Sequence, residues 1–192
     1  MIKVALTGNI ASGKSTAELF LKELGFLCLN TDDISHQILR NNSDVINAFK
    51  SFDILDEHGS ISREKLGKIV FSDIKLLKVL ENIIHPIVRK KIQEFFSAHA
   101  DKEIVFVAIP QLFESGMQDL FDKIILIYCD DDIRIERLIK RNGYDKNYAK
   151  TRISAQISQE EKVKLCDYVI DNSSTLENLQ SLVKTLPEKL KG

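Results

Sequence analysis

The chain has 192 residues, of which 27 are Lys or Arg and 28 are Asp or Glu, so its formal net charge is −1. This length suits one well-buried core, the interspersed charges argue against nucleic-acid partners and polybasic membrane patches, and no stretch reaches the roughly 20 apolar residues of a membrane span. Because the N-terminus also lacks a signal-peptide pattern, we expect a cytoplasmic protein without membrane or nucleic-acid partners.

The first segment is predicted to form a strand, a phosphate-binding loop and a helix. An apolar run at residues 2–6 precedes Gly8-Asn9-Ile10-Ala11-Ser12-Gly13-Lys14-Ser15-Thr16, which has the spacing G-x-x-x-x-G-K-[ST]. The two glycines can adopt backbone angles that a side chain forbids, so successive N–H groups can form an anion nest at the positive end of the helix dipole. Lys14 can reach the β- and γ-phosphates, and the Ser15 hydroxyl can ligate Mg²⁺. We therefore predict nucleotide binding by Gly8, Ala11, Ser12, Gly13, Lys14, Ser15 and Thr16.

A second strand is predicted at residues 26–29, and the polar residues 30–33 are expected to cap a helix that continues through Leu39. Ligands of open α/β sheets bind at the carboxyl ends of the strands. Asp32 or Asp33 is therefore expected to project beside the phosphate loop. The alternative interpretation is that Asp32 only caps its helix.

Residues 41 to about 100 follow a mostly helical pattern. It predicts short amphipathic helices at residues 44–52 and 63–71, and then a longer helix that is interrupted at His85-Pro86. So long a helical insertion between two strands is unusual for a minimal α/β fold. We interpret it as a separate lobe that could hold an acceptor substrate.

Two apolar strands follow, at residues 104–109 and 123–128. Pro110 stops the first strand, and residues 111–116 are expected to form a loop or short helix at the ligand end of the sheet. Acidic residues 130–132 start the next helix, where capping explains them better than metal binding does.

That helix, predicted at residues 133–141, places Arg137 and Arg141 on one face, because side chains four residues apart are neighbours on a helix. Two interpretations remain open for this pair. The arginines could close over bound phosphates, or they could be solvated residues paired with acids such as Glu136.

The rest of the pattern predicts a helix from about Lys146 into Ser158, a last strand at residues 168–170 and a C-terminal helix to Leu190. Asn172 follows the last strand, where nucleotide-binding folds often seat adenine, although an Asx turn explains it nearly as well. The three cysteines lie in or beside apolar runs and form no C-x-x-C pair, so we predict buried, reduced thiols for Cys28, Cys129 and Cys166.

Pieces from nearly the whole chain, in order, resemble one family. They are Leu6-Thr7-Gly8 through Ser15-Thr16, Asp32 with Ile34 and Gln37, Gly59 with Arg63 and Leu66, Ile84-His85-Pro86-Ile87, Pro110 with Leu112-Phe113-Glu114, Arg137 with Arg141, Ala155-Gln156, Lys162, and Val169-Ile170-Asp171-Asn172. Together they resemble dephospho-CoA kinases, P-loop kinases that phosphorylate the ribose 3′-hydroxyl of dephospho-CoA in the final step of CoA synthesis. Many families share the phosphate loop, whereas its combination with His85-Pro86 and with Pro110 to Glu114 is specific.

The resemblance implies an α/β fold in which a P-loop kinase core has a five-stranded parallel sheet flanked by helices. It further implies a single domain over residues 1–192, with a helical substrate-binding insertion at about 41–100 and a lid at about 137–160. The expected ligands are ATP with Mg²⁺ and dephospho-CoA, and the expected state is a monomer.

The implied site has three groups of residues. The catalytic residues are Asp32, Lys14, Arg137 and Arg141. Asp32 is expected to accept the proton from the ribose hydroxyl or to orient it, and the arginines to stabilise the developing charge. The phosphate loop and Asn172 bind ATP, with Ser15 on the metal. The substrate-binding residues are Asp32, His85, Pro110, Leu112 and Glu114, although His85 could be purely structural and Glu114 could reach Mg²⁺ through water or merely support its loop.

The chain also departs from the family pattern. Asn30 stands where the family usually has the first Asp of Asp-Ala-Asp, and Asp33 is an extra acid one residue late. The loop starts Gly8-Asn9-Ile10-Ala11 in place of Gly-Gly-Ile-Gly, and Gln111 replaces a usual Leu. Another small-molecule kinase would share the loop arguments, whereas a GTP-dependent switch would need an Asn-Lys-x-Asp tetrapeptide, which the sequence lacks.

Overall fold

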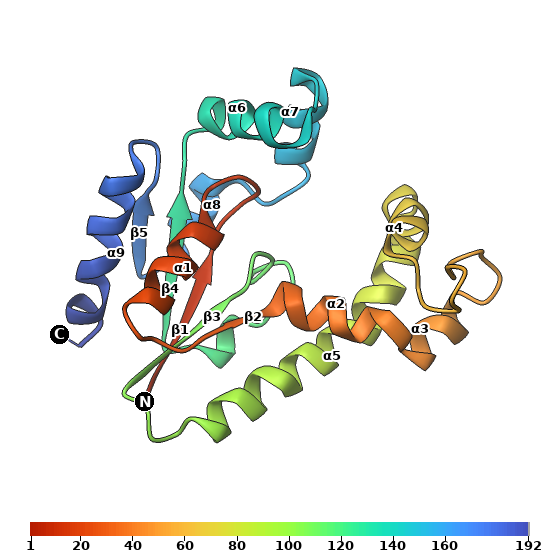
Figure 1. Ribbon diagram of the computed structural model, residues 1–192, viewed down its shortest axis with the longest axis horizontal. Helices are drawn as coiled ribbons and strands as arrows, with labels where there is room; N and C mark the ends of the chain where they lie inside the picture. The colour runs from red at the N-terminus through yellow and green to blue at the C-terminus, as the bar shows by residue number, and fades with distance from the viewer. Residues whose placement is uncertain (192) are drawn as a thin grey trace. The chain divides into compact units, whose positions relative to one another are not determined.

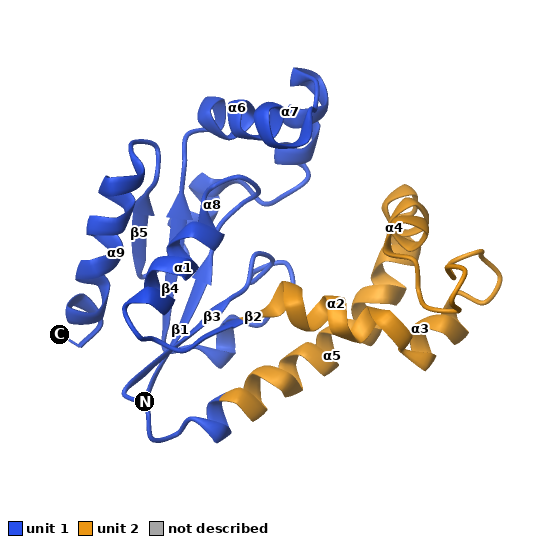
Figure 2. Ribbon diagram, viewed as in Figure 1, with its two compact units in different colours: residues 1–29, 96–192 blue, residues 30–95 orange. Residues whose placement is uncertain are grey.

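The computed structural model describes residues 1–191, which divide into two compact units (Figure 2). Unit 1 comprises Met1–Leu29 and the described chain from Phe96 onward, and unit 2 comprises Asn30–Phe95. The chain leaves unit 1 through strand β2 (Cys28–Asn30) and returns to it through helix α5 (Ile74–Ala98). Within residues 1–191, no helix combines the length and apolar character that crossing a bilayer requires.

Unit 1 is built on a five-stranded parallel sheet in the order β2-β3-β1-β4-β5 (Figure 1). Besides β2, the strands are β1 (Ile2–Thr7), β3 (Ile104–Ala108), β4 (Lys123–Tyr128) and β5 (Tyr168–Asp171). The central β1 pairs with β3 on one side and β4 on the other, so that Val4 lies opposite both Phe106 and Lys123. All residues of β3 are buried, as expected of a central parallel strand. The predicted α/β fold is confirmed.

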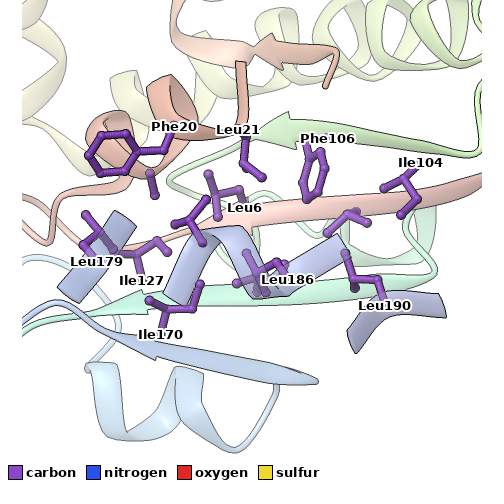
Figure 3. Packing of buried hydrophobic residues seen from close by; sticks show 14 residues of the cluster. Leu6, Phe20, Leu21, Ile104, Phe106, Ile127, Ile170, Leu179, Leu186 and Leu190 are labelled. Atoms are coloured by element: carbon purple, nitrogen blue, oxygen red, sulfur yellow. The ribbon is translucent and has the colours of Figure 1, made fainter. Parts of the chain in front are cut away.

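Two helices of unit 1 cover one face of this sheet, α1 (Lys14–Glu23) and α9 (Leu176–Lys191). Figure 3 shows their apolar side chains against those of the strands: Leu6, Phe20, Leu21, Ile104, Phe106, Ile127, Ile170, Leu179, Leu186 and Leu190. Each such side chain contributes on the order of 2 kcal/mol when fully buried, which makes this layer the main stabilising element of the unit. It fixes the position of β1 and α1, and therefore of the loop that joins them.

The remaining helices of unit 1 follow β4. They are α6 (Asp131–Asn142), α7 (Lys146–Ser154) and the short α8 (Gln159–Val163), and a 3-10 turn η1 (Gln118–Leu120) precedes β4. The prediction of a single helix from Lys146 into Ser158 is wrong. The reason is local: Ser158 caps α8, because its side chain accepts a hydrogen bond from the Glu161 N–H at 3.2 Å.

Unit 2 consists of α2 (Thr31–Asn41), α3 (Ser43–Ala48), α4 (Arg63–Ser72) and most of α5. Residues 56–60 form the turn between α3 and α4, and Leu55 and Ile61 bridge across it. The helix predicted at 63–71 is confirmed, whereas the one predicted at 44–52 ends early, at Ala48.

Helix α5 corrects one prediction. It runs unbroken through Pro86 over 25 residues, so the interruption at His85-Pro86 is wrong. An internal proline costs about 3 kcal/mol. Ile84, Val88 and Ile92 are buried at four-residue spacing on the same helix, and their burial at roughly 2 kcal/mol each outweighs that cost.

Candidate nucleotide-binding site

The phosphate loop joins β1 to α1 and depends on its two glycines for different reasons. Gly13 has φ 96°, and a Cβ there would overlap the Asn172 amide nitrogen. Gly8 has no positive φ, but a Cβ there would lie 2.5 Å from Ser12 Oγ and 2.9 Å from the Ile127 carbonyl oxygen. The predicted need for unusual backbone angles therefore holds for Gly13, whereas Gly8 is needed for space.

Helix α1 begins without a side-chain cap. Gly13 is its N-cap and supplies no side-chain cap, and the first turn holds no acidic residue. The first N–H groups of a helix need an acceptor and carry the positive end of the dipole. The start of α1 is thus suited to an anion, and Lys14 lies buried at this point.

Three side chains bond to carbonyl oxygens of the loop. Arg137 Nη1 lies 3.2 Å from the Ala11 oxygen and 3.4 Å from the Ser12 oxygen. Asn172 Nδ2 donates to the same Ser12 oxygen at 2.7 Å, and Arg137 Nη2 donates to the Asn172 carbonyl at 3.0 Å. Arg134 Nε donates to the Ile10 carbonyl at 2.9 Å. These carbonyls are therefore turned toward α6 and the end of β5.

The segment after α7 holds the start of the loop. Asn9 Nδ2 donates to the Ile157 carbonyl, and the Ile10 N–H donates to Gln156 Oε1, both at 2.8 Å. Asn9 and Ser12 are buried. The loop is therefore fixed from two sides by contacts more than 120 residues apart in the sequence.

Of the two predicted arginines, the structure brings only Arg137 to the loop. Arg141 is exposed in the last turn of α6, where its Nε donates to Asn142 Oδ1 at 2.9 Å. Among the ion pairs of the described residues, none joins Glu136 to either arginine. Asn172 is buried against the loop, and the Asx turn at this point belongs to Asp171, whose Oδ1 accepts from the Ser173 N–H.

Three site residues were not predicted from the sequence as loop contacts: Arg134, Asn9 and Gln156. Arg134 is 1% exposed, and its Nη1 pairs with Asp131 Oδ1 at 2.6 Å. Burial lowers the pKa of this guanidinium, and the adjacent Asp131 opposes that shift. The only sequence signal was its spacing of three residues from Arg137, which places both on one face of α6.

The crevice loop after β3, residues 110–116, was predicted to bind substrate. Leu112 is fully buried, and the Pro110 carbonyl accepts from Thr7 Oγ1 at 3.3 Å. Glu114 Oε1 lies 2.9 Å from Nζ of Lys162, a fully buried side chain on α8. The two atoms are close enough for an ion pair, but their geometry is not that of a hydrogen bond, so the interaction is electrostatic. It links the crevice loop to α8.

Asp32 and His85 belong to unit 2. Asp32 lies in the first turn of α2, and its N–H donates to Oδ1 of Asn30, which is the N-cap. The cap is therefore Asn30, and the interpretation of Asp32 as the cap is wrong. Asp32 and Asp33 are exposed, and His85 is half-buried in the middle of α5.

Two other kinds of site were considered outside the phosphate loop, a metal-binding cluster and a reactive thiol. Within residues 1–191, no group of three or more His, Cys, Asp or Glu side chains could hold a metal ion. All three cysteines are free, and Cys129 is buried while the other two are partly buried. Burial, with Glu18 nearby, raises the pKa of Cys28 to about 12, and burial raises that of Cys166 to about 11, so both thiols stay protonated at neutral pH.

Known proteins resemble this chain along nearly its whole length. The family model described as dephospho-CoA kinase matches residues 2–178. A dephospho-CoA kinase from Carboxydothermus hydrogenoformans is 43% identical over 196 residues, covering 98% of this chain and 94% of the relative. The structure of a Thermus thermophilus protein matches with a TM-score of 0.85 at 32% identity, covering 100% of this chain and 98% of that one. Dephospho-CoA kinase from Campylobacter jejuni gives a TM-score of 0.76 at 34% identity, with 99% and 98% covered.

Proposed function

The chain belongs to the dephospho-CoA kinase family, as its sequence pattern predicted, and on this premise we propose how its residues carry out the family's reaction. The family phosphorylates dephospho-CoA with ATP to give CoA, in the last step of CoA biosynthesis. The protein is accordingly an ATP-dependent kinase. The hydroxyl that we propose as acceptor is the ribose 3′-hydroxyl of dephospho-CoA.

The observation that carries the donor site is the conformation of the phosphate loop. Gly13 opens α1 without a side-chain cap, and Arg137 and Asn172 hold the neighbouring carbonyls. We propose that these N–H groups bind the β- and γ-phosphates of ATP and that Lys14 adds a mobile positive charge. Because the carbonyls already have donors, the loop needs little rearrangement when ATP binds.

For the acceptor, we propose that Asp32 takes the proton from the ribose hydroxyl or orients it for in-line attack. Since Asn30 caps α2, Asp32 is not required for that structural role. Asp33 is the neighbouring carboxylate and the alternative base. We propose that His85, Pro110 and Leu112 belong to the acceptor site by family resemblance.

The protein side chains at the loop offer too few ligands for a divalent cation on their own, so the phosphates of the nucleotide must supply the others. Mg²⁺ bound to ATP neutralises charge on the β- and γ-phosphates. Ser15 is exposed in the first turn of α1, and residues 1–191 hold no cluster of three metal-binding side chains. We therefore propose Ser15 as the protein ligand, with phosphate oxygens and water as the others.

Arg137 and Arg141 are proposed to stabilise the transferring phosphoryl group. Arg137 already contacts the loop, whereas Arg141 would have to move from its exposed position at the end of α6. Arginines in such positions contribute on the order of 10³-fold to the rate in other kinases. We further propose that the enzyme works as a monomer in the cytoplasm.

The test is coupled ADP release with ATP and Mg²⁺, using dephospho-CoA, adenosine, AMP, shikimate or no acceptor. We expect turnover with dephospho-CoA alone. Replacement Asp32→Asn should lower turnover by roughly 100-fold or more while ATP still binds, because only general-base catalysis is lost. ADP release that is equal with another acceptor would contradict the proposed substrate, and full activity of the variant would exclude Asp32 as the base.

A further inference from the structure

Arg134 is the largest of the fully buried side chains in the described chain, and its charge is directed at the phosphate loop. Its Nε donates to the Ile10 carbonyl at 2.9 Å, and its Nη1 pairs with Asp131 at 2.6 Å. A buried guanidinium is costly unless it is paired and hydrogen-bonded. Here Nε and Nη1 have partners, one loop carbonyl and one carboxylate, whereas the buried Nη2 has no hydrogen-bond partner in the described residues. The charge is therefore buried at some cost, which calls for a reason for its position.

The guanidinium is itself anchored to the sheet. Asp131 Oδ1 also accepts from Gln159 Nε2 at 3.2 Å. The Gln159 amide in turn pairs with the backbone of Cys129, donating to its oxygen at 2.8 Å and accepting from its nitrogen at 3.1 Å. A continuous set of hydrogen bonds therefore runs from the end of β4 through Asp131 and Arg134 to Ile10.

Ile10 is held on both of its backbone groups. Its N–H donates to Gln156 Oε1 at 2.8 Å, and its carbonyl accepts from Arg134 Nε. The next residue, Ala11, has φ 62°, a left-handed conformation that a non-glycine residue keeps only when its surroundings impose it. Fixing the Ile10 peptide is one such constraint, because its orientation sets where the Ala11 backbone starts.

We propose that Arg134 is a positioning residue for ATP: it holds the Ile10 carbonyl outward, so that the loop keeps its anion-binding conformation before the nucleotide arrives. This inference rests on the proposed ATP site at the loop and goes beyond it by assigning a role to Arg134. It acts through backbone geometry and not through contact with ATP. Arg134 therefore affects ATP binding and leaves acceptor binding unchanged.

The side-chain lengths supply a discriminating set of variants. In Arg134→Gln, the amide nitrogen occupies the position of Arg Nε and can still donate to Ile10. In Arg134→Met, a methyl group occupies that position and no donor remains. Arg134→Lys keeps the charge but moves the donor one bond further out. Lys140→Gln, an exposed site on the same helix, is the matched control for lost charge.

Equilibrium binding of a fluorescent ATP analogue and steady-state kinetics with both substrates test the proposal. We expect Arg134→Met to raise Kd and KM for ATP by about tenfold, the effect of one lost charge-assisted hydrogen bond. Arg134→Gln should restore most of this loss and Arg134→Lys little of it. KM for dephospho-CoA should stay within about twofold in all variants, as should all constants for the control.

ATP binding by Arg134→Met as tight as by wild type, or no better binding by Arg134→Gln than by Arg134→Met, would overturn the proposal. If the Met variant does not fold, the Gln and Lys variants decide, because equal ATP affinity of these two would contradict a role for the Nε position. Wild-type protein that binds ATP but does not phosphorylate dephospho-CoA would refute the proposed function alone, since the binding series still reports on Arg134.

Discussion

Ala11 is the only non-glycine residue with positive φ within residues 1–191, and it lies inside the phosphate loop. The family usually has glycine at this position. A left-handed conformation costs a residue with a side chain about 1–2 kcal/mol, and glycine avoids this cost. Glycine also has more conformational entropy in the unfolded state, which reduces the gain by about 0.5–1 kcal/mol. Ala11→Gly should therefore raise the free energy of unfolding by roughly 0.5 kcal/mol, measured by urea denaturation. A clear loss of stability would mean that the Ala11 methyl group makes a favourable contact.

Asn172 tests the bracing of the loop at a second point. It is buried and donates to the Ser12 carbonyl at 2.7 Å. Asn172→Ala removes this donor and should weaken ATP binding by about fivefold to tenfold, measured by calorimetric titration. Asn178→Ala is the matched control, because Asn178 is exposed and bonds only locally to Ser174 and Thr175. Equal ATP affinity of the two variants would contradict the bracing role.

At the scale of elements, the ion pair of Glu114 with Lys162 links the crevice loop after β3 to α8. Glu114→Gln leaves a fully buried ammonium without its carboxylate and should cost about 3 kcal/mol of unfolding free energy. The double variant with Lys162→Met should recover much of this loss, because an apolar side chain suits the same site. Glu161→Gln, exposed on α8, is the control in the same denaturation series. A negligible effect of Glu114→Gln would mean that water reaches Lys162.

Most elements could be predicted because hydrophobic periodicity decides them. Strand β4 was predicted at its exact limits, and the loop between β1 and α1 followed from its glycine spacing. The continuation of α5 through its proline could not be predicted, because burial along the helix outweighs the local signal of the proline. The end of α7 could not be predicted either, because the Ser158 cap starts a separate helix. The contact of Arg134 with Ile10 spans 124 residues, so the local sequence indicates only that Arg134 shares a helix face with Arg137 and does not identify its partner.

At the scale of the whole molecule, Cys28 couples stability to alkaline pH. Its pKa is raised from 9.0 to about 12, first by burial and then by Glu18. The folded state thus favours the neutral thiol, so this contribution to stability is complete below pH 9 and is lost as pH rises toward 12. Between pH 9 and 11, wild type should lose about 1 kcal/mol per pH unit more than Cys28→Ala. The free energy of unfolding of both proteins is measured by urea denaturation at each pH. An equal loss in the two proteins would contradict burial of the Cys28 thiol.

We propose that the braced loop delivers the γ-phosphoryl group of ATP to the ribose 3′-hydroxyl of dephospho-CoA. The most direct measurement is ³¹P NMR of the reaction of wild-type protein with ATP, Mg²⁺ and dephospho-CoA. We expect one new phosphomonoester signal, coupled to the ribose H3′ proton and growing in step with ADP. A phosphoryl group on any other hydroxyl, or ADP with inorganic phosphate alone, would contradict it.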